Sequence, residues 1–120
     1  AKRTWFTAEE RAVMLREATA HLPQVEVVHF SGLLIHACAQ HRASVILRGL
    51  RALSDFDLEF RNGLANRDMS GIETLFLLTD PAHIFVSSSL VKEIHGNGGD
   101  VSRYVPADVL RALRARPATP

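Results

Sequence analysis

The pattern of apolar and polar positions predicts helices and strands that alternate along the chain. Thr7 and Glu10 have the spacing of a capping box, and apolar residues then recur at helical spacing until Pro23. Further helices are predicted at residues 33–41, at residues 54–68, at residues 87–95, and from Pro106 as a first helical position. Short apolar or β-branched runs predict strands at residues 25–30, 44–47 and 74–78.

This alternation indicates the α/β class, with parallel strands joined by right-handed helical crossovers. Two of the predicted strands lack polar alternation, which is typical of strands covered by helices on both faces. A chain of 120 residues is expected to form a single domain, residues 1–120. Ligands in such sheets bind beyond the carboxyl ends of the strands, so residues 48–51 and 83–89 become candidate loops.

Composition and charge exclude several classes of protein. The 14 Lys and Arg residues against 13 Asp and Glu give a formal net charge of +1, too balanced for wrapping a nucleic acid. A hydrophobic share of 47% with 22% charged residues is ordinary for a soluble globular protein, and no apolar run is long enough to span a bilayer. The single Cys38 allows no internal disulfide, favours a reducing cytoplasmic location and is expected in the core.

Arginines and serines occupy the two candidate loops. Arg48 and Arg51 flank Gly49 at the end of a predicted strand, where guanidinium groups and an unobstructed backbone suit a phosphate. The alternative is two ordinary surface arginines. The three serines at residues 87–89 open a predicted helix, where they either form an anion cradle or simply cap the helix.

Acidic and histidine side chains offer no metal site by their spacing. Asp55 and Asp57 fit the acidic start of a helix, whereas Glu59 lies a turn further on, on a face that could point back toward the loop at residues 48–51. The six histidines show no metal-ligand spacing. Only His83 lies in a candidate ligand loop, where it could stack on a base or contact its edge.

Three stretches of the chain together resemble one family. They are VILRGLRALSDFDLE at residues 45–59, Asn66-Arg67, and FVSSSLVKE at residues 85–93. They resemble bacterial phosphopantetheine adenylyltransferases, in the nucleotidylyltransferase superfamily, and the likeness runs from Lys2 to about Leu113. The resemblance implies a Rossmann-like parallel sheet of the nucleotidylyltransferase type. It also implies an enzyme that joins ATP to 4'-phosphopantetheine, giving dephospho-coenzyme A and pyrophosphate.

The resemblance further implies which residues contact each substrate. The residues implied as catalytic are Lys2 and Arg51. Those implied to bind 4'-phosphopantetheine are Lys2, Leu34, Arg48, Asn66 and Glu93. Those implied to bind ATP are Gly49, Leu50, Arg51, Glu59, His83, Ile84, Phe85, Val86, Ser87, Ser88 and Ser89. The implied chemistry is a direct in-line attack of the pantetheine phosphate on the α-phosphorus of ATP, without a covalent enzyme intermediate.

The resemblance also carries expectations about cofactor and assembly. It implies Mg²⁺ bound with ATP, a cytoplasmic homohexamer built as two stacked trimers, and feedback inhibition by coenzyme A. Neither nucleic acid nor membrane is an expected partner.

This sequence departs from the family at its start. Family members begin with a strand and a GTFDPxTxGH motif that is absent here, so a first βα unit on the order of 40 residues is expected to be missing. Apolar sheet edges are then expected to be exposed. Two alternatives stay open: a noncatalytic fragment that binds ATP or coenzyme A, and a related nucleotidylyltransferase with another phosphate acceptor.

Overall fold

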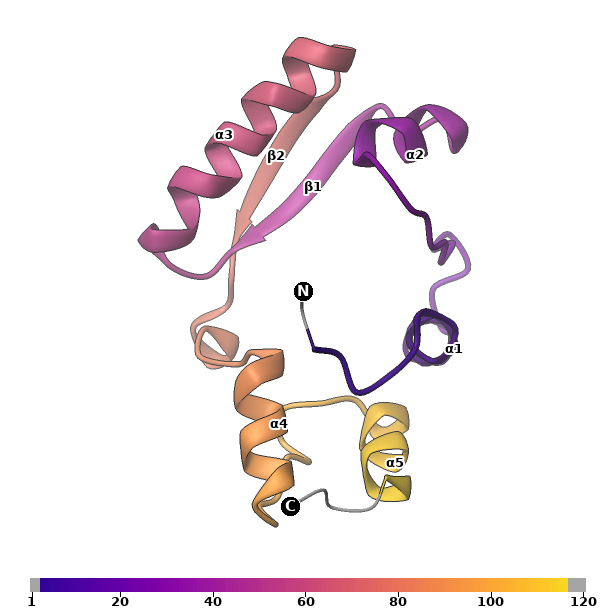
Figure 1. The fold of residues 1–120 in the computed structure, drawn as a ribbon, viewed down its shortest axis with the longest axis vertical. Helices are drawn as coiled ribbons and strands as arrows, with labels where there is room; N and C mark the ends of the chain where they lie inside the picture. The colour runs from indigo at the N-terminus through magenta and orange to yellow at the C-terminus, as the bar shows by residue number, and fades with distance from the viewer. Residues whose placement is uncertain (1–2, 117–120) are drawn as a thin grey trace. The chain divides into compact units, whose positions relative to one another are not determined.

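The computed structural model describes residues 3–116, apart from the side chain of Ser54. The chain is divided into two compact units. One combines the two ends of the sequence, Ala1–His29 and Val86–Pro120, and the other is the middle segment Phe30–Phe85. Figure 1 labels the helices and strands of both units. No helix within residues 3–116 has the length and apolar character needed to cross a bilayer.

The middle unit is built around a parallel pair of strands (Figure 1). Its elements are α2 (Leu34–Gln40), β1 (Val45–Leu50), α3 (Leu53–Ser70), β2 (Glu73–Leu78) and the short 3-10 helix η1 (Pro81–His83). The register runs from Val45 opposite Glu73 to Leu50 opposite Leu78, with α3 as the crossover. The predicted α/β class with parallel strands is confirmed.

Strand β1 extends further than the sequence pattern predicts. Its expected end was residue 47, but Arg48 and Gly49 pair with Phe76 and Leu77 of β2. The ladder then continues past the strand, because the backbone N–H of Thr79 donates to the carbonyl oxygen of Leu50 at 2.9 Å. The charged side chain of Arg48 is tolerated inside the strand because it donates hydrogen bonds to the Glu59 carboxylate on α3.

The two faces of the sheet differ in cover. Helix α3 packs on the sheet, and Ile46 is buried. Gly63 of α3 allows a close approach, since a Cβ there would lie 3.5 Å from the Cβ of Thr74. The alternate side chains are exposed: Val45, Leu47, Leu75 and Leu77. Within the described residues α3 packs on one face of the sheet, and the other face presents these apolar side chains to solvent. The expected exposure of apolar sheet edges stays a prediction.

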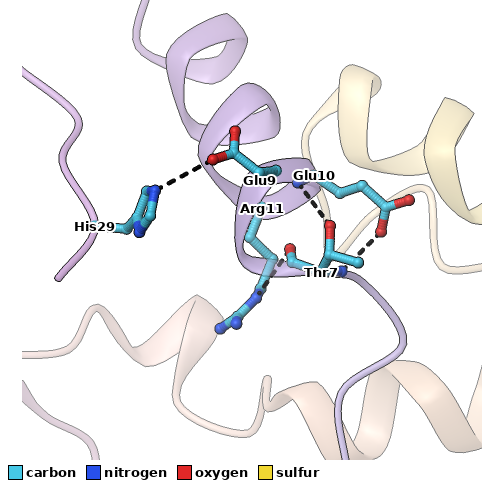
Figure 2. A network of polar contacts seen from close by, with 5 residues as sticks. All are labelled: Thr7, Glu9, Glu10, Arg11 and His29. Carbon is cyan, nitrogen blue, oxygen red and sulfur yellow. Dashed lines mark hydrogen bonds and ion pairs between the residues drawn. The ribbon is translucent and has the colours of Figure 1, made fainter. Parts of the chain in front are cut away.

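The other unit contains three helices: α1 (Ala8–Ala18), α4 (Ser88–Gly96) and α5 (Ala107–Ala115). The predicted capping box is confirmed: the backbone N–H of Thr7 donates to Glu10 Oε2 at 2.7 Å, and that of Glu10 to Thr7 Oγ1 at 3.1 Å (Figure 2). Glu9, on the same turn, lies 3.3 Å from His29 Nε2. Pro106 is the N-cap of α5, one residue before its predicted place.

The core of this unit lies around three buried residues, Val91, Val101 and Leu113. Helix α4 ends in a Schellman motif, in which Gly99 N–H donates to the carbonyl of Ile94 at 2.8 Å. Gly98 supplies the positive φ of +81° that this ending requires. The unit's two chain segments are further joined by an Arg111–Glu17 ion pair at 3.3 Å.

The strand predicted at residues 25–30 is wrong. These residues have no regular secondary structure, and Val25, Val28 and Phe30 are exposed. β-branched side chains favour a strand only where a neighbouring strand completes the hydrogen-bond ladder. The described sheet consists of β1 and β2 alone, so this segment has no pairing partner there.

Candidate functional site

The best-defined polar arrangement in the middle unit joins β1 to α3. Arg48 Nε donates to Glu59 Oε2 at 2.9 Å, and Arg48 Nη2 donates to Glu59 Oε1 at 2.6 Å. This is a bidentate guanidinium–carboxylate pair, the geometry in which arginine binds carboxylate most specifically. The prediction that Glu59 points back toward Arg48 is confirmed.

Both members of this pair are held in their charged forms. The hydrogen bonds from Arg48, aided by its positive charge, lower the pKa of Glu59 below its usual value. The hydrogen bond to Glu59, followed by the attraction of its charge, raises the pKa of Arg48. The Glu59 side chain is only 16% exposed, whereas that of Arg48 is 50% exposed. Because the pair uses only part of the guanidinium donors, the exposed half of Arg48 can still bind an anion.

Helix α3 presents a polar face that includes Glu59. Its less exposed positions are Asp55, Glu59, Gly63 and Asn66. Their spacing of three to four residues puts them on one face of the helix. Because the helix rises about 1.5 Å per residue, Asn66 lies about 10 Å further along it than Glu59. Leu34 is partly buried on α2. Neither Asn66 nor Leu34 takes part in the hydrogen bonds between Arg48 and Glu59.

The residues after Arg48 lie at the carboxyl end of β1, as expected for a ligand loop. Gly49 and Leu50 are the last two residues of the strand, and the exposed Arg51 follows directly. A Cβ at Gly49 would meet only Thr79 Oγ1, at 3.9 Å. The glycine therefore leaves open space beside the main chain in this unit.

The second candidate loop spans the division between the two units. His83 ends η1, which is capped by Asp80 Oδ1 accepting from Ala82 N–H at 2.9 Å. The side chains of His83, Ile84 and Phe85 are all exposed. These three residues are the last in the sequence of the middle unit, whereas residues 86–89 belong to the other unit.

The serines open α4, as predicted. Ser87 is the N-cap, and its Oγ accepts from Leu90 N–H at 3.1 Å, so the capping role holds for this residue. Ser88 and Ser89 form the first turn and are exposed, whereas Val86 is partly buried. The backbone N–H groups of a first helical turn have no partners within the helix. Such groups, with the helix dipole, suit an anion.

The two remaining sequence-predicted residues are Glu93 and Lys2. Glu93 is an exposed residue of α4, one turn beyond the serines. Lys2 lies outside the described residues, so its role stays a prediction. Residues 3–116 contain no group of three or more His, Cys, Asp or Glu side chains that could hold a metal. Cys38 is buried in α2, which confirms its predicted place in the core.

Sequence reasoning missed the contact of Lys92. Its Nζ donates to the carbonyl oxygen of Arg3 at 2.7 Å, across 89 positions of sequence. Local spacing carries no signal for a contact over that separation.

Comparison with known proteins gives consistent matches along the chain. Residues 1–94 match a family described as cytidylyltransferase-like. The chain is 50% identical over 115 residues to a phosphopantetheine adenylyltransferase of Thermobifida fusca, a match that covers 96% of this chain and 70% of that protein. It is 47% identical over 116 residues to the Streptomyces coelicolor protein of the same name, with 97% and 73% covered. The chain thus belongs to the phosphopantetheine adenylyltransferase family of cytidylyltransferase-like proteins.

Proposed function

We propose that this protein transfers the adenylyl group of ATP to 4'-phosphopantetheine, giving dephospho-coenzyme A and pyrophosphate. The observation that carries the proposal is the 50% identity over 96% of the chain to a protein named for phosphopantetheine adenylylation. The charged Arg48 near the end of β1 and the first turn of α4 support the proposal, because guanidinium donors and a helix N-terminus suit the phosphates of the two substrates.

The reaction requires alignment and charge stabilisation rather than acid–base catalysis. An oxygen of the pantetheine phosphate attacks the α-phosphorus of ATP, and the bond from that phosphorus to the pyrophosphate oxygen breaks. The attacking phosphate is already ionised, so no general base is needed. The protein must hold two anions in line and stabilise the charge that spreads over the oxygens of the α-phosphorus.

The residues divide between the two substrates as follows in this proposal. The groups for 4'-phosphopantetheine are Lys2, Leu34, Arg48, Asn66 and Glu93. The groups for ATP are Gly49, Leu50, Arg51, Glu59 and residues 83–89. Lys2 and Arg51 would stabilise charge during transfer. The exposed half of Arg48 supports its assignment, because its guanidinium stays charged and keeps donors toward solvent.

The contact between Arg48 and Glu59 changes what Glu59 does in this scheme. We propose that Glu59 acts through Arg48, by orienting its guanidinium, as well as on the ATP side. Glu59→Gln should then raise the KM for 4'-phosphopantetheine in the same direction as Arg48→Ala does. Arg51→Ala should act mainly on the KM for ATP. An effect of Glu59→Gln confined to ATP would contradict the role through Arg48.

Further parts of the proposal concern the metal, the assembly and the location. Mg²⁺ would enter as the ATP complex, and its chemistry is to neutralise phosphate charge. We further propose a homohexamer of two stacked trimers, feedback inhibition by coenzyme A, and a cytoplasmic location. Light scattering of the full-length protein tests the assembly, and a monomer at working concentration would contradict it.

Pyrophosphate release by the full-length protein is the direct test of the activity. The expected result is release that requires both ATP and 4'-phosphopantetheine, together with dephospho-coenzyme A detected by mass. Release with a different phosphorylated acceptor only would show a related nucleotidylyltransferase. Binding of ATP or coenzyme A without any turnover would show a noncatalytic protein and would refute the proposal.

A further inference from the structure

A cavity of about 450 Å³ opens in the unit that combines the two ends of the chain. Its wall is formed by the end of α4, by the turn at residues 98–101 that follows, and by the end of α5. The volume falls within the range of about 300 to 1,000 Å³ that is usual for small-molecule sites. The serines assigned above to ATP open α4 at its other end, about 10 Å away along the helix axis. None of them lines this cavity.

Two arginines at the end of α5, Arg114 and Arg116, line the cavity. Neither forms an ion pair with any carboxylate in residues 3–116. The guanidinium of Arg116 lies over two aromatic rings instead, 5.4 Å from the centroid of Trp5 and 5.5 Å from that of Phe6. Such contacts use the face of a guanidinium, so the N–H groups at its edge can still donate to an anion.

Asp100 is an acidic residue of the same wall. Hydrogen bonds from Ser102 and, less strongly, the charges of Arg114 and Arg103 hold the pKa of Asp100 below its usual value. Asp100 is therefore ionised, yet it forms no ion pair with Arg114 in the described part of the chain. Two guanidinium groups and one carboxylate leave this wall with a net positive charge, which favours an anion.

Hydrogen bonds hold the wall of the cavity in place. His95 Nε2 donates to the carbonyl oxygen of Leu113 at 3.0 Å, which ties the end of α4 to the last turn of α5. The N–H groups of Gly98 and Gly99 donate to the carbonyls of His95 and Ile94, so these carbonyls of α4 do not need the arginines as caps. A wall that is already fixed loses little conformational freedom when a ligand binds.

Apolar side chains also line the cavity. Val101 is a residue of the core cluster, and the partly buried Leu110 packs against that cluster. The volume is many times the roughly 30 Å³ that one water molecule occupies in the liquid, so a phosphate ion alone would leave most of the cavity to water. An organic group attached to the phosphate would cover Leu110 and remove its apolar surface from water.

We propose that this cavity binds a small organic phosphate. The phosphoryl oxygens accept hydrogen bonds from Arg114 and Arg116, and the organic part packs on Leu110. The charge of Asp100 opposes the anion, while its carboxylate can accept from a hydroxyl group on the organic part. The inference does not rest on the proposed function, because it uses none of the residues assigned to adenylyl transfer.

Binding is measured on the full-length protein by NMR of methyl groups, with phenyl phosphate as the probe. The titration is run at about pH 8, where a phosphate monoester is a dianion because its second pKa is about 6. The methyl signals of Val101 and Leu110 report on the cavity, so binding at any other anion site is read separately. We expect both signals to shift and saturate, with an affinity about threefold or more above that of inorganic phosphate.

Three arginine variants test the phosphate contacts. Arg114→Gln and Arg116→Gln should each weaken binding of phenyl phosphate about tenfold or more, because each removes a charged hydrogen-bond donor. Arg111→Gln is the matched control, since Arg111 belongs to the same helix and is exposed but does not line the cavity. It should change the affinity by less than about twofold.

Asp100→Asn gives an effect of the opposite sign. It removes the opposing charge, while the amide oxygen can still accept from Ser102 N–H, so phenyl phosphate should bind about twofold or more tightly. Methyl signals that stay unchanged at saturating phenyl phosphate would overturn the proposal, as would an unchanged affinity in both arginine variants. Equal affinity for inorganic phosphate would overturn the organic part of the ligand. If Arg116→Gln does not fold, Arg114→Gln decides alone by the same criterion.

Discussion

The Arg48–Glu59 pair should contribute about 1 kcal/mol of coupling energy to the free energy of unfolding. Exposed ion pairs contribute about 0.2 to 1 kcal/mol, and hydrogen bonds to charged groups about 1.5 to 3 kcal/mol. Glu59 is 16% exposed, which favours the stronger range, but Arg48 is 50% exposed, so water screens the pair. A value of about 1 kcal/mol corresponds to roughly a fivefold change in the folding equilibrium.

The coupling energy should depend on pH in a definite direction. The pKa of Glu59 is lowered in the folded protein from its ordinary 4.5. Its contribution to stability is therefore fully present above 4.5 and is lost as the pH falls through the lower folded value. The pKa of Arg48 is raised further above an already high value, so Arg48 stays charged throughout this range.

A double-mutant cycle in urea measures this coupling. The cycle uses the wild type, Arg48→Met, Glu59→Gln and the double variant, at neutral pH and again well below pH 4.5. The matched control is the Arg67–Glu73 pair, whose charged atoms are 3.7 Å apart and whose side chains are 53% and 59% exposed. We expect a coupling near zero for the control. Equal coupling in the two pairs, or a coupling for Arg48 that persists in acid, would refute the reasoning.

Three further predictions concern stability in the other unit. Gly99→Ala should destabilise by about 1 to 3 kcal/mol, because its Cβ would lie 2.5 Å from Ile94 Cγ2 and 3.0 Å from the Ile94 carbonyl oxygen; Gly96→Ala, whose Cβ first meets an indole ring at 3.8 Å, should be neutral or stabilising in the same urea titration. Thr7→Ala should cost about 1 kcal/mol, because the capping box is lost; an unchanged urea midpoint would show that the cap is dispensable. Leu113→Ala, at a core position 2% exposed, should cost about 2 to 5 kcal/mol; a thermal midpoint within about 1 °C of the wild type would contradict this.

The parts of the fold that were predictable are those that depend on neighbouring residues. The capping box, helix α3, strand β2 and the crossover between parallel strands follow from spacing and apolar runs. The extent of β1 does not, because its last residues depend on pairing with β2 and on Glu59 accepting the Arg48 side chain. The strand predicted at residues 25–30 is absent for the same physical reason, because strand propensity does not supply a partner strand.

In the candidate site, too, contacts set by neighbouring residues were predictable and contacts between distant residues were not. The direction of Glu59 toward Arg48 was predictable, because helix periodicity sets which residues share a face. The Lys92 contact was not predictable, because it joins residues 89 apart in sequence. The role of Ser87 as a cap was one of two predicted alternatives, and the hydrogen bond to Leu90 N–H confirms the local one.

The split of one unit between the two ends of the chain has a consequence for the order of folding. The β1–α3–β2 segment is continuous, whereas the contact of Lys92 with Arg3 requires closure over the whole segment Phe30–Phe85. Closure entropy grows with loop length, by about 0.6 kcal/mol per doubling, and non-local contacts form late. We therefore expect pulsed hydrogen exchange to protect β1 and β2 before Arg3. A partly unfolded chain would then keep the Arg48–Glu59 pair while the segment beside Lys2 is already released.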